Sequence, residues 1–145
     1  MENFIYPAKI TPDKKDGGFV VTFPDLPEAI TQGEGLRDAI VGATDCLEEA
    51  IANRIAMELT IPYPSPIRKR YHPIPLSVQM AAKAALYLAI SEEEITKVEL
   101  AKRLHCDEKE VRRLLNPRHP SKLPRIESAL AVLGRKLVVG FQTAV

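Results

Sequence analysis

Residues 17–51 are GGFVVTFPDLPEAITQGEGLRDAIVGATDCLEEAI, and the spacing of their apolar side chains changes halfway along. Residues 18–23 form a β-rich run, and a shorter run, residues 29–31, follows the PDLP corner. From Leu36 onward the apolar residues recur every three or four positions, at Ala39, Ile40, Ala43, Leu47, Ala50 and Ile51. Acidic residues lie mostly opposite them, at Asp38, Asp45, Glu48 and Glu49. The stretch therefore predicts two strands followed by a long amphipathic helix.

A further β-rich run, residues 4–10, precedes this stretch. The connection between them, TPDKKDGG, contains Asp16, Gly17 and Gly18, which supply the positive φ that a hairpin turn requires. The predicted order is β-β-β-α. Because one sheet face and one helix stripe must be buried together, residues 1–66 are expected to form a small two-layer α+β domain.

The next segment, residues 61–75, is IPYPSPIRKRYHPIP and contains five prolines. Each proline removes a backbone donor and restrains the preceding residue to extended geometry, so this segment cannot be helical. We expect residues 67–75 to be a proline-rich linker. Residues 68–71 could add a short strand to the first domain, and whether residues 68–75 form a strand remains open. The domain boundary is placed near residue 76.

Residues 76–145 are expected to form an all-α domain. Ser77 opens a helix that runs to about Ile90, and three short helices follow. Thr96 with Glu99, and Asp107 with Glu110, have the spacing of capping boxes for the first two of these helices. The pair Asn116-Pro117 ends the second one.

A last helix is predicted in the residues after Asn116-Pro117. Ser121 is its expected N-cap, Pro124 is tolerated in its first turn, and Gly134 ends it in a left-handed conformation. Residues 136–143 resemble a strand and are predicted to close the chain as a short final strand.

Residues 97–116, KVELAKRLHCDEKEVRRLLN, have the pattern of two helices that cross through a tight turn, as in a helix-turn-helix. Ala101 is small where the helices must approach each other. His105 stands at the turn position where glycine is usual, so it should adopt positive φ. The inner face is formed by Leu100, Leu104, Cys106, Val111 and Leu114.

The outer face of the second helix is the candidate DNA-binding surface, because such a helix lies in the major groove. It presents Glu108, Lys109, Arg112, Arg113 and Asn116. The following loop offers groups for phosphate contacts, namely Arg118, His119, Ser121 and Lys122. Arg112 and Arg113 can offer paired donors to guanine, whereas Glu108 either accepts from cytosine or acts as a favourable charge at the helix N-terminus. The alternative is a solvated basic helix in a bundle.

The charge distribution divides the 145 residues in the same way. The chain carries a formal net charge of +1, but residues 1–66 hold 5 basic and 11 acidic side chains, a net charge of −6. Residues 67–145 hold 15 basic and 8 acidic side chains, a net charge of +7. This asymmetry favours an anion-binding C-terminal half joined to a domain with a different role.

Other chemistries find little support in the sequence. Cys46 and Cys106 fall on inner helix faces, the three histidines are scattered, and the predicted strands carry no carboxylates for metal-dependent hydrolysis. We therefore expect no enzyme activity, no metal and no cofactor. No apolar run has the length of a membrane-spanning helix, and the N-terminal sequence lacks the features of a secretory signal, so a cytoplasmic protein is expected.

Residues 17–51 resemble the N-terminal domain of the HicB antitoxin family. The matching residues are the FPDLP corner (residues 23–27), Thr31, Gly33, and Asp38, Ala39 and Ala43 of the helix. The predicted helix-turn-helix resembles that of the longer HicB subtype, which is similar to Cro and lambda-repressor domains.

This resemblance implies a partly degraded ribonuclease-H-like fold without catalysis. It also implies a HicA-like, mRNA-cleaving toxin as partner and repression of the shared operon through operator double-stranded DNA. The resemblance assigns no particular residues to toxin contact. A stand-alone transcription regulator with a ligand-sensing N-terminal domain is the alternative.

We also expect a homodimer or higher homo-oligomer, because one short recognition helix buries too little surface to bind an operator tightly. Residues 136–143 are the candidate dimer strand, and packing of this run on its own domain is the alternative.

Overall fold

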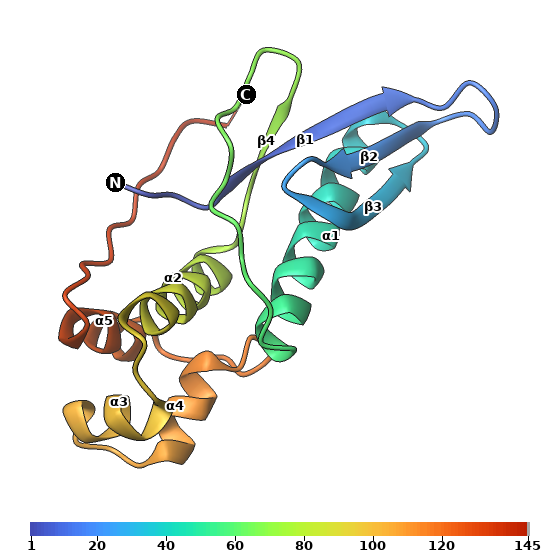
Figure 1. Cartoon of the computed structure of the whole chain (residues 1–145). Helices are drawn as coiled ribbons and strands as arrows, with labels where there is room; N and C mark the ends of the chain where they lie inside the picture. Colours follow the sequence, from blue (N-terminus) through green and yellow to red (C-terminus); the bar gives the residue numbers. More distant parts are fainter. Residues whose placement is uncertain (145) are drawn as a thin grey trace. The chain divides into compact units, whose positions relative to one another are not determined.

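The structure is a computed structural model and describes residues 1–144. Backbone contacts divide the chain into two compact units. Unit 1 is Met1–Ser77, and unit 2 begins at Val78. The class is α+β, as predicted, with a sheet and one helix in unit 1 and helices in unit 2 (Figure 1).

Unit 1 contains a four-stranded antiparallel sheet with the order β3-β2-β1-β4. Its strands are β1 (Ile5–Pro12), β2 (Phe19–Phe23), β3 (Leu26–Gly33) and β4 (His72–Pro75). The predicted hairpin turn joins β1 to β2, with φ of 78° at Gly17 and 72° at Gly18. Pro24 and Asp25 form the corner between β2 and β3, where Phe23 pairs with Leu26.

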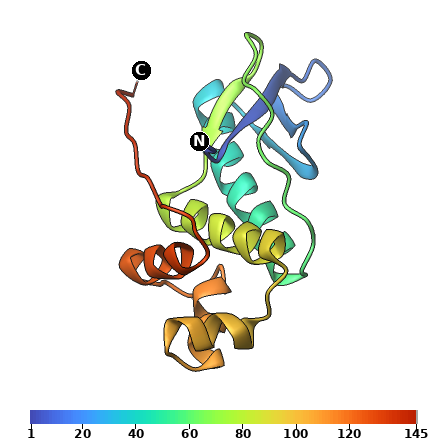
Figure 2. The same ribbon diagram turned by 60° about the vertical axis from the view of Figure 1, so that its left-hand side comes forward.

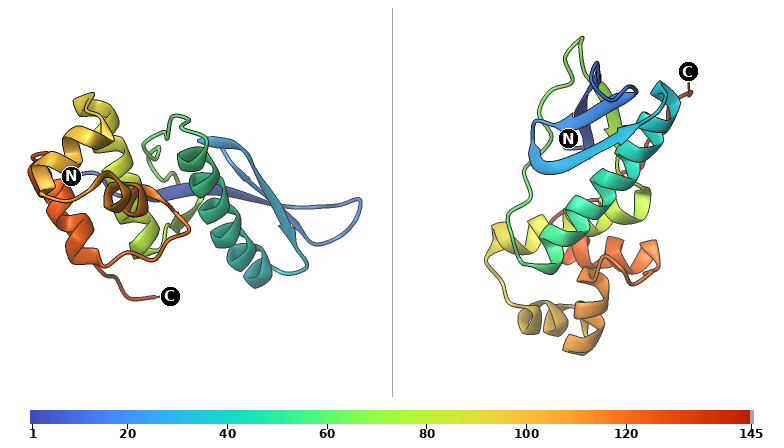
Figure 3. Two further views of the ribbon diagram at one scale, coloured as in Figure 1. Left: turned by 90° about the horizontal axis from the view of Figure 1, so that it is seen from below. Right: turned by 90° about the vertical axis from the view of Figure 1, so that its right-hand side faces the viewer.

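The helix α1 (Leu36–Ala56) lies along one face of this sheet and packs mainly on β3 (Figure 3). Its buried side chains include the predicted Ala39, Ala43 and Leu47. The two backbones approach most closely at Gly33, where a Cβ atom would lie 2.5 Å from the Ala39 amide nitrogen. Gly33 is therefore required for α1 to lie on the sheet, which gives a physical reason for glycine at this position.

The proline-rich segment folds back on unit 1. The Tyr6 hydroxyl donates a hydrogen bond of 2.7 Å to the Pro62 carbonyl, and both the Ser65 amide and its hydroxyl donate to the Asp25 carboxylate. The strand left open in residues 68–75 exists and is formed by His72–Pro75, whereas residues 68–71 precede it. It pairs with β1 at the sheet edge, where prolines are tolerated because one side of the strand needs no donors.

Unit 2 consists of α2 (Val78–Glu93), α3 (Lys97–Leu104), α4 (Glu108–Leu115) and α5 (Leu123–Val132), as Figure 2 shows. Its core is apolar and draws on all four helices. The members with the lowest exposure include Leu86, Leu100, Val111, Ile126 and Ala129. This core fixes α3 and α4 against α2 and α5, so the second predicted domain has its own hydrophobic centre.

Two local predictions for the end of the chain are wrong. Ser121 does not cap α5, because Lys122 is the N-cap residue and makes no side-chain cap hydrogen bond. Residues 136–143 do not form a strand. A strand needs a partner, and the described part of unit 2 contains no other strand for them to pair with, so a strand here would have to pair with a second copy of the chain. The expected ends are otherwise present, with Pro124 in the first turn of α5 and Gly134 at φ 73°.

Candidate nucleic-acid interface

The turn between α3 and α4 has the predicted geometry. His105 ends α3 in the left-handed region, with φ 55° and ψ 42°, and only Cys106 and Asp107 separate it from α4. Histidine is among the non-glycine residues that tolerate this region. The short connection sets α3 and α4 at a fixed angle, since the buried Leu100 and Val111 pack in the common core.

Both helices begin with the expected caps. The Thr96 hydroxyl accepts a 3.1 Å hydrogen bond from the Glu99 amide, and the Asp107 carboxylate accepts one of 2.8 Å from the Glu110 amide. These bonds satisfy backbone donors that each helix start leaves without an intrahelical partner. The start of α4 is therefore defined by Asp107, which fixes which side chains point outward.

The faces of α4 are those predicted from the sequence. Val111, Leu114 and Leu115 are buried. The side chains of Arg112 and Arg113 are 62% and 47% exposed, and Lys109 and Asn116 are also exposed. One turn of α4 therefore presents two guanidinium groups to solvent.

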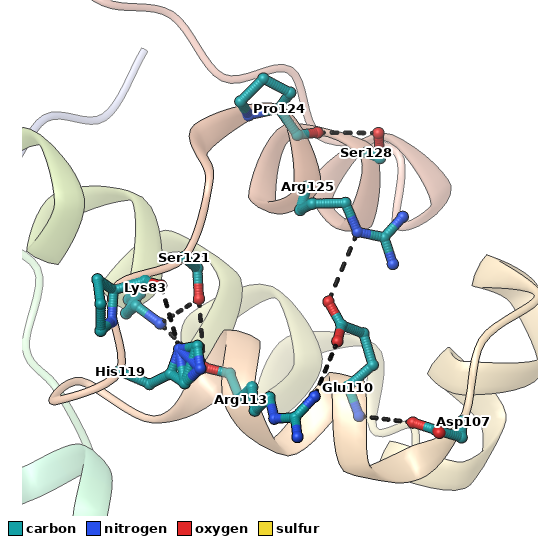
Figure 4. Close-up of polar contacts among 10 residues, drawn as sticks. Lys83, Asp107, Glu110, Arg113, His119, Ser121, Pro124, Arg125 and Ser128 are labelled. Atoms are coloured by element: carbon teal, nitrogen blue, oxygen red, sulfur yellow. Dashed lines mark hydrogen bonds and ion pairs between the residues drawn. The ribbon is translucent and has the colours of Figure 1, made fainter.

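Carboxylates on α4 hold these arginines. Glu108 pairs with Arg112 at 2.7 Å, and Glu110 lies between Arg113 at 3.7 Å and Arg125 of α5 at 3.6 Å (Figure 4). Such exposed pairs are weak and exchange readily, so the arginines remain available to a stronger anion. Sequence reasoning missed Arg125, because nothing in the spacing of α5 shows that it faces α4.

The loop after α4 is ordered by its own polar groups. The Asn116 side chain accepts from the Arg118 amide at 3.0 Å, and its carbonyl accepts from the His119 amide at 3.1 Å. Arg118 and Lys122 are exposed, whereas His119 is partly buried and its ring contacts the Pro120 carbonyl at 3.1 Å. Two of the predicted phosphate contacts, Arg118 and Lys122, therefore lie on the surface of the loop.

Ser121, also predicted as a phosphate contact, has its polar groups engaged inside unit 2. Its amide donates to the Gln79 side chain at 2.9 Å, and its carbonyl accepts from the same side chain at 2.8 Å. Its hydroxyl accepts from the Lys83 ammonium at 2.9 Å. Sequence reasoning missed Gln79 and Lys83, which are one helical turn apart on α2.

Unit 1 carries the other polar features. Arg54 makes two hydrogen bonds to Glu28, of 2.6 and 2.9 Å, and one of 2.9 Å to the Thr60 carbonyl. This pairing lowers the pKa of Glu28, and burial raises the pKa of Tyr6 well above its usual value. These contacts tie the end of α1 and the proline-rich segment to the sheet, so we assign them a structural role.

The structural boundary also changes the charge of each part. Arg68, Lys69 and Arg70 belong to unit 1, which then holds 8 basic and 11 acidic side chains, a net charge of −3. Unit 2 holds 12 basic and 8 acidic side chains, a net charge of +4. The asymmetry keeps its sign but is smaller than the sequence division suggested.

Residues 1–144 contain no group of three or more His, Cys, Asp or Glu side chains arranged to hold a metal ion. Both cysteines are free, and burial raises the pKa of Cys46. In the same range, no helix has the length and apolarity needed to cross a membrane.

The fold and site define a two-part protein, in which a small α+β unit precedes a helical unit with an exposed basic helix. Residues 5–85 match the family described as "HicB_like antitoxin of bacterial toxin-antitoxin system". The chain therefore belongs to the HicB-like antitoxin family.

Curated relatives extend this similarity over most of the chain. The chain is 37% identical to Antitoxin HicB of Escherichia coli over 132 residues, which cover 91% of this chain and 95% of the relative. It is 32% identical to Antitoxin HicB 1 of Photorhabdus laumondii over 142 residues, 98% of this chain and 90% of the relative. With Antitoxin HicB of Pseudomonas fluorescens the identity is 29% over 132 residues, 90% of each chain. Unlike the family match, these similarities include α3, α4 and α5.

Proposed function

We propose that this protein is the antitoxin of a type II toxin–antitoxin pair in the cytoplasm. It neutralises a HicA-like, mRNA-cleaving toxin by direct binding through unit 1, and it represses its own operon through unit 2. Both activities are non-enzymatic and need no cofactor. The observation that carries the second activity is the pair of exposed arginines, Arg112 and Arg113, on a helix fixed by a tight left-handed turn.

The proposed DNA contacts divide into two classes. Arg112 and Arg113 reach base edges from α4, with Lys109, Glu108 and Asn116 beside them. Arg118 and Lys122 contact phosphates, with His119 and the partly buried Ser121 in the same loop. Because Glu108 is paired with Arg112 and lies in the first turn of α4, we assign it to charge stabilisation of the helix N-terminus rather than to cytosine.

The test is binding of alanine variants to an operator duplex and a random duplex across a salt series. Arg112→Ala and Arg113→Ala should each cost about 1–3 kcal/mol on the operator and little on random DNA, because a paired base contact is lost. Arg118→Ala and Lys122→Ala should weaken both complexes equally and reduce the salt slope by about one unit each. Equal losses on both duplexes for the α4 variants would show that this face of α4 does not enter the groove.

The proposed toxin-binding part is unit 1, and its test uses residues 1–77. A fragment that ends at residue 66 would lack β4, which pairs with β1, so residue 77 is the appropriate end. The resemblance to the HicB family implies a basic toxin, and the net charge of −3 on unit 1 favours association with such a partner. Co-expression of the folded fragment with a HicA-like toxin that the full chain neutralises should restore growth. Failure to do so, when the full chain succeeds, would contradict the division of labour.

The proposed oligomer is at least a dimer. Residues 136–144 carry exposed apolar side chains, with Val138, Val139 and Phe141 all more than half exposed. An apolar run of this kind, left without a partner in one chain, supports pairing with a second copy. Light scattering at micromolar concentration should give a dimer or larger species. A chain ending at Arg135 should form an oligomer with fewer copies, or a monomer. A monomeric full-length chain would contradict this proposal.

A further inference from the structure

Among the described residues, Lys83 is the one buried polar or charged side chain, and its exposed fraction is 0%. It projects from the second turn of α2 toward the end of α4, and no carboxylate pairs with it among the hydrogen bonds of this site. Burial lowers the pKa of Lys83 to about 8. A buried charge is costly, so its retention in an apolar core calls for a specific role.

The ammonium group donates three hydrogen bonds. Two of them, both 3.0 Å long, go to the carbonyls of Arg113 and Leu114 in the last turn of α4. The third goes to the Ser121 hydroxyl at 2.9 Å, as Figure 4 shows. The carbonyls at a helix C-terminus carry partial negative charge, which makes them suitable acceptors for a cation. The Arg113 carbonyl also accepts from the Asn116 amide at 3.2 Å, so it is shared between this cap and Lys83.

Gln79 completes this arrangement one turn earlier on α2. Its amide group both donates to and accepts from the Ser121 backbone, at 2.8 and 2.9 Å. Together, Gln79 and Lys83 contact both ends of the connection between α4 and α5. We call these two side chains the α2 clamp.

The clamp acts on the parts of unit 2 that carry the proposed DNA contacts. Arg112 and Arg113 lie in the turn of α4 whose carbonyls accept from Lys83, and Arg118 and Lys122 lie in the loop that ends at Ser121. A small rotation of α4 would move both arginines. Because guanidinium contacts to base edges need close geometric agreement, such a rotation would weaken base recognition.

We infer that the α2 clamp makes Lys83 and Gln79 positioning residues for DNA recognition: they hold the last turn of α4 and its loop in the orientation that base contacts require. This inference rests on the proposed function of unit 2. Lys83 itself does not contact DNA, since its ammonium group is fully engaged inside the unit.

The test compares the full chain with Lys83→Met, Gln79→Leu and Lys122→Met. Methionine keeps the length and volume of lysine but removes the charge and donors. Gln79→Leu loosens the clamp without changing any charge. Lys122→Met is the matched control, because it removes the same charge from the exposed surface of the loop held by the clamp.

Operator binding should separate these variants. We expect Lys83→Met and Gln79→Leu to weaken operator binding by about tenfold, comparable to the loss of one base contact, with a much smaller effect on random DNA and an unchanged salt slope. Lys122→Met should weaken both duplexes equally and lower the slope by about one unit.

A second measurement uses the free protein. Amide hydrogen exchange of the full chain without DNA should be faster at Asn116, His119 and Ser121 in both clamp variants. The amide of Leu100 in α3 should keep its protection, which shows that unit 2 remains folded. If Lys83→Met does not fold, Gln79→Leu still provides both measurements.

The outcomes distinguish the clamp from the proposed function. A folded Lys83→Met or Gln79→Leu chain with the wild-type preference for operator over random DNA would overturn the positioning role. Equal losses on both duplexes with a lower salt slope in Lys83→Met would do so too, by indicating a phosphate contact. A wild-type chain with no preference for its operator would overturn the proposed function, and the positioning role with it.

Discussion

The two units differ in the internal contacts that stabilise each of them. In unit 1 a long helix lies directly on a sheet, and the critical contact is the close backbone approach at Gly33. In unit 2 the helices α3, α4 and α5 are short, and side chains fix both ends of α4: its own N-cap Asp107 at the start and Lys83 of α2 at the end. The packing of α1 on its sheet therefore depends mostly on shape, and polar contacts in unit 1 tie the proline-rich segment and the end of α1 to the sheet. In unit 2 particular polar groups fix the ends of the helix that carries the candidate site.

The largest expected effects come from the two cores. Leu47 of unit 1 and Leu114 of unit 2 are almost fully buried, so Leu47→Ala and Leu114→Ala should each cost about 2–5 kcal/mol. If the units fold independently, each substitution lowers the melting temperature of its own unit only. Calorimetry of the full chain checks this. A shift of both transitions by either variant would show that the units unfold together.

The next prediction tests the dependence of unit 1 on shape. Gly33→Ala would place a Cβ atom against the backbone of α1, and we expect it to destabilise unit 1 by about 1–3 kcal/mol. Gly42→Ala is the matched control within α1, because its Cβ atom would make ordinary contacts of 3.7 Å with Thr31. It should stabilise the helix by about 0.5–1 kcal/mol. Urea unfolding measures both, and similar effects would contradict the close approach at Gly33.

Alkaline pH should change the stabilities of the two units in opposite directions. The pKa of Lys83 is lowered to about 8 by burial, below the usual value of 10.5. Between these values the unfolded chain binds more protons than the folded one, so the free energy of unfolding of unit 2 rises with pH. We expect a gain on the order of 1 kcal/mol by pH 9.5, absent in Lys83→Met.

Tyr6 has the opposite effect on unit 1. Its pKa is raised by burial, so folded Tyr6 stays protonated while the unfolded chain ionises above about pH 10. The stability of unit 1 should therefore fall above that pH, and Tyr6→Phe should remove this fall. Unfolding curves from pH 7.5 to 11 measure both units together. A parallel pH dependence of the two transitions would contradict the assignment.

The smallest effects are expected for the surface ion pairs. Glu28→Gln breaks a two-bond pair with a partly buried Arg54 and should cost about 0.5–1 kcal/mol, whereas Glu108→Gln should change stability by less than about 0.5 kcal/mol. Releasing Arg112 should instead strengthen operator binding. Chemical unfolding and duplex binding give the two readouts. Weaker operator binding by Glu108→Gln would point to a direct role for Glu108 at the interface.

Local chemistry made much of this fold predictable. The positive φ at Gly17, Gly18 and His105, and the caps at Thr96 and Asp107, follow from rules that act within a few residues. The patterns of apolar residues that located β1, β2, β3 and the helices α1 to α5 also act over short ranges, whereas β4 and the strand expected at residues 136–143 were not located correctly. Their ends were less predictable, as in α1, which runs to Ala56 and so beyond the last apolar position used to predict it.

Contacts between distant elements could not be predicted. Lys83 lies in an Ala-rich helix, and nothing in its spacing shows that the end of α4 will meet it. Serine is a residue type favoured at helix N-caps, but the polar groups of Ser121 form hydrogen bonds with Gln79 and Lys83 instead. The position of β4 depends on which residues of the linker can reach the free edge of β1 in the folded sheet. The positions of the prolines alone do not determine it.

The connection between the units has a consequence for tethering. Only Leu76 and Ser77 separate β4 from α2, and the Leu76 amide is itself bonded to the Phe4 carbonyl at 3.0 Å. Two residues span at most about 7 Å, so the covalent connection between β4 and α2 is short. If each unit binds a macromolecule, as proposed, this connection keeps the two macromolecules at a high local concentration relative to each other. Steric exclusion or mutual contact between them can thus couple their occupancies without any change in either fold.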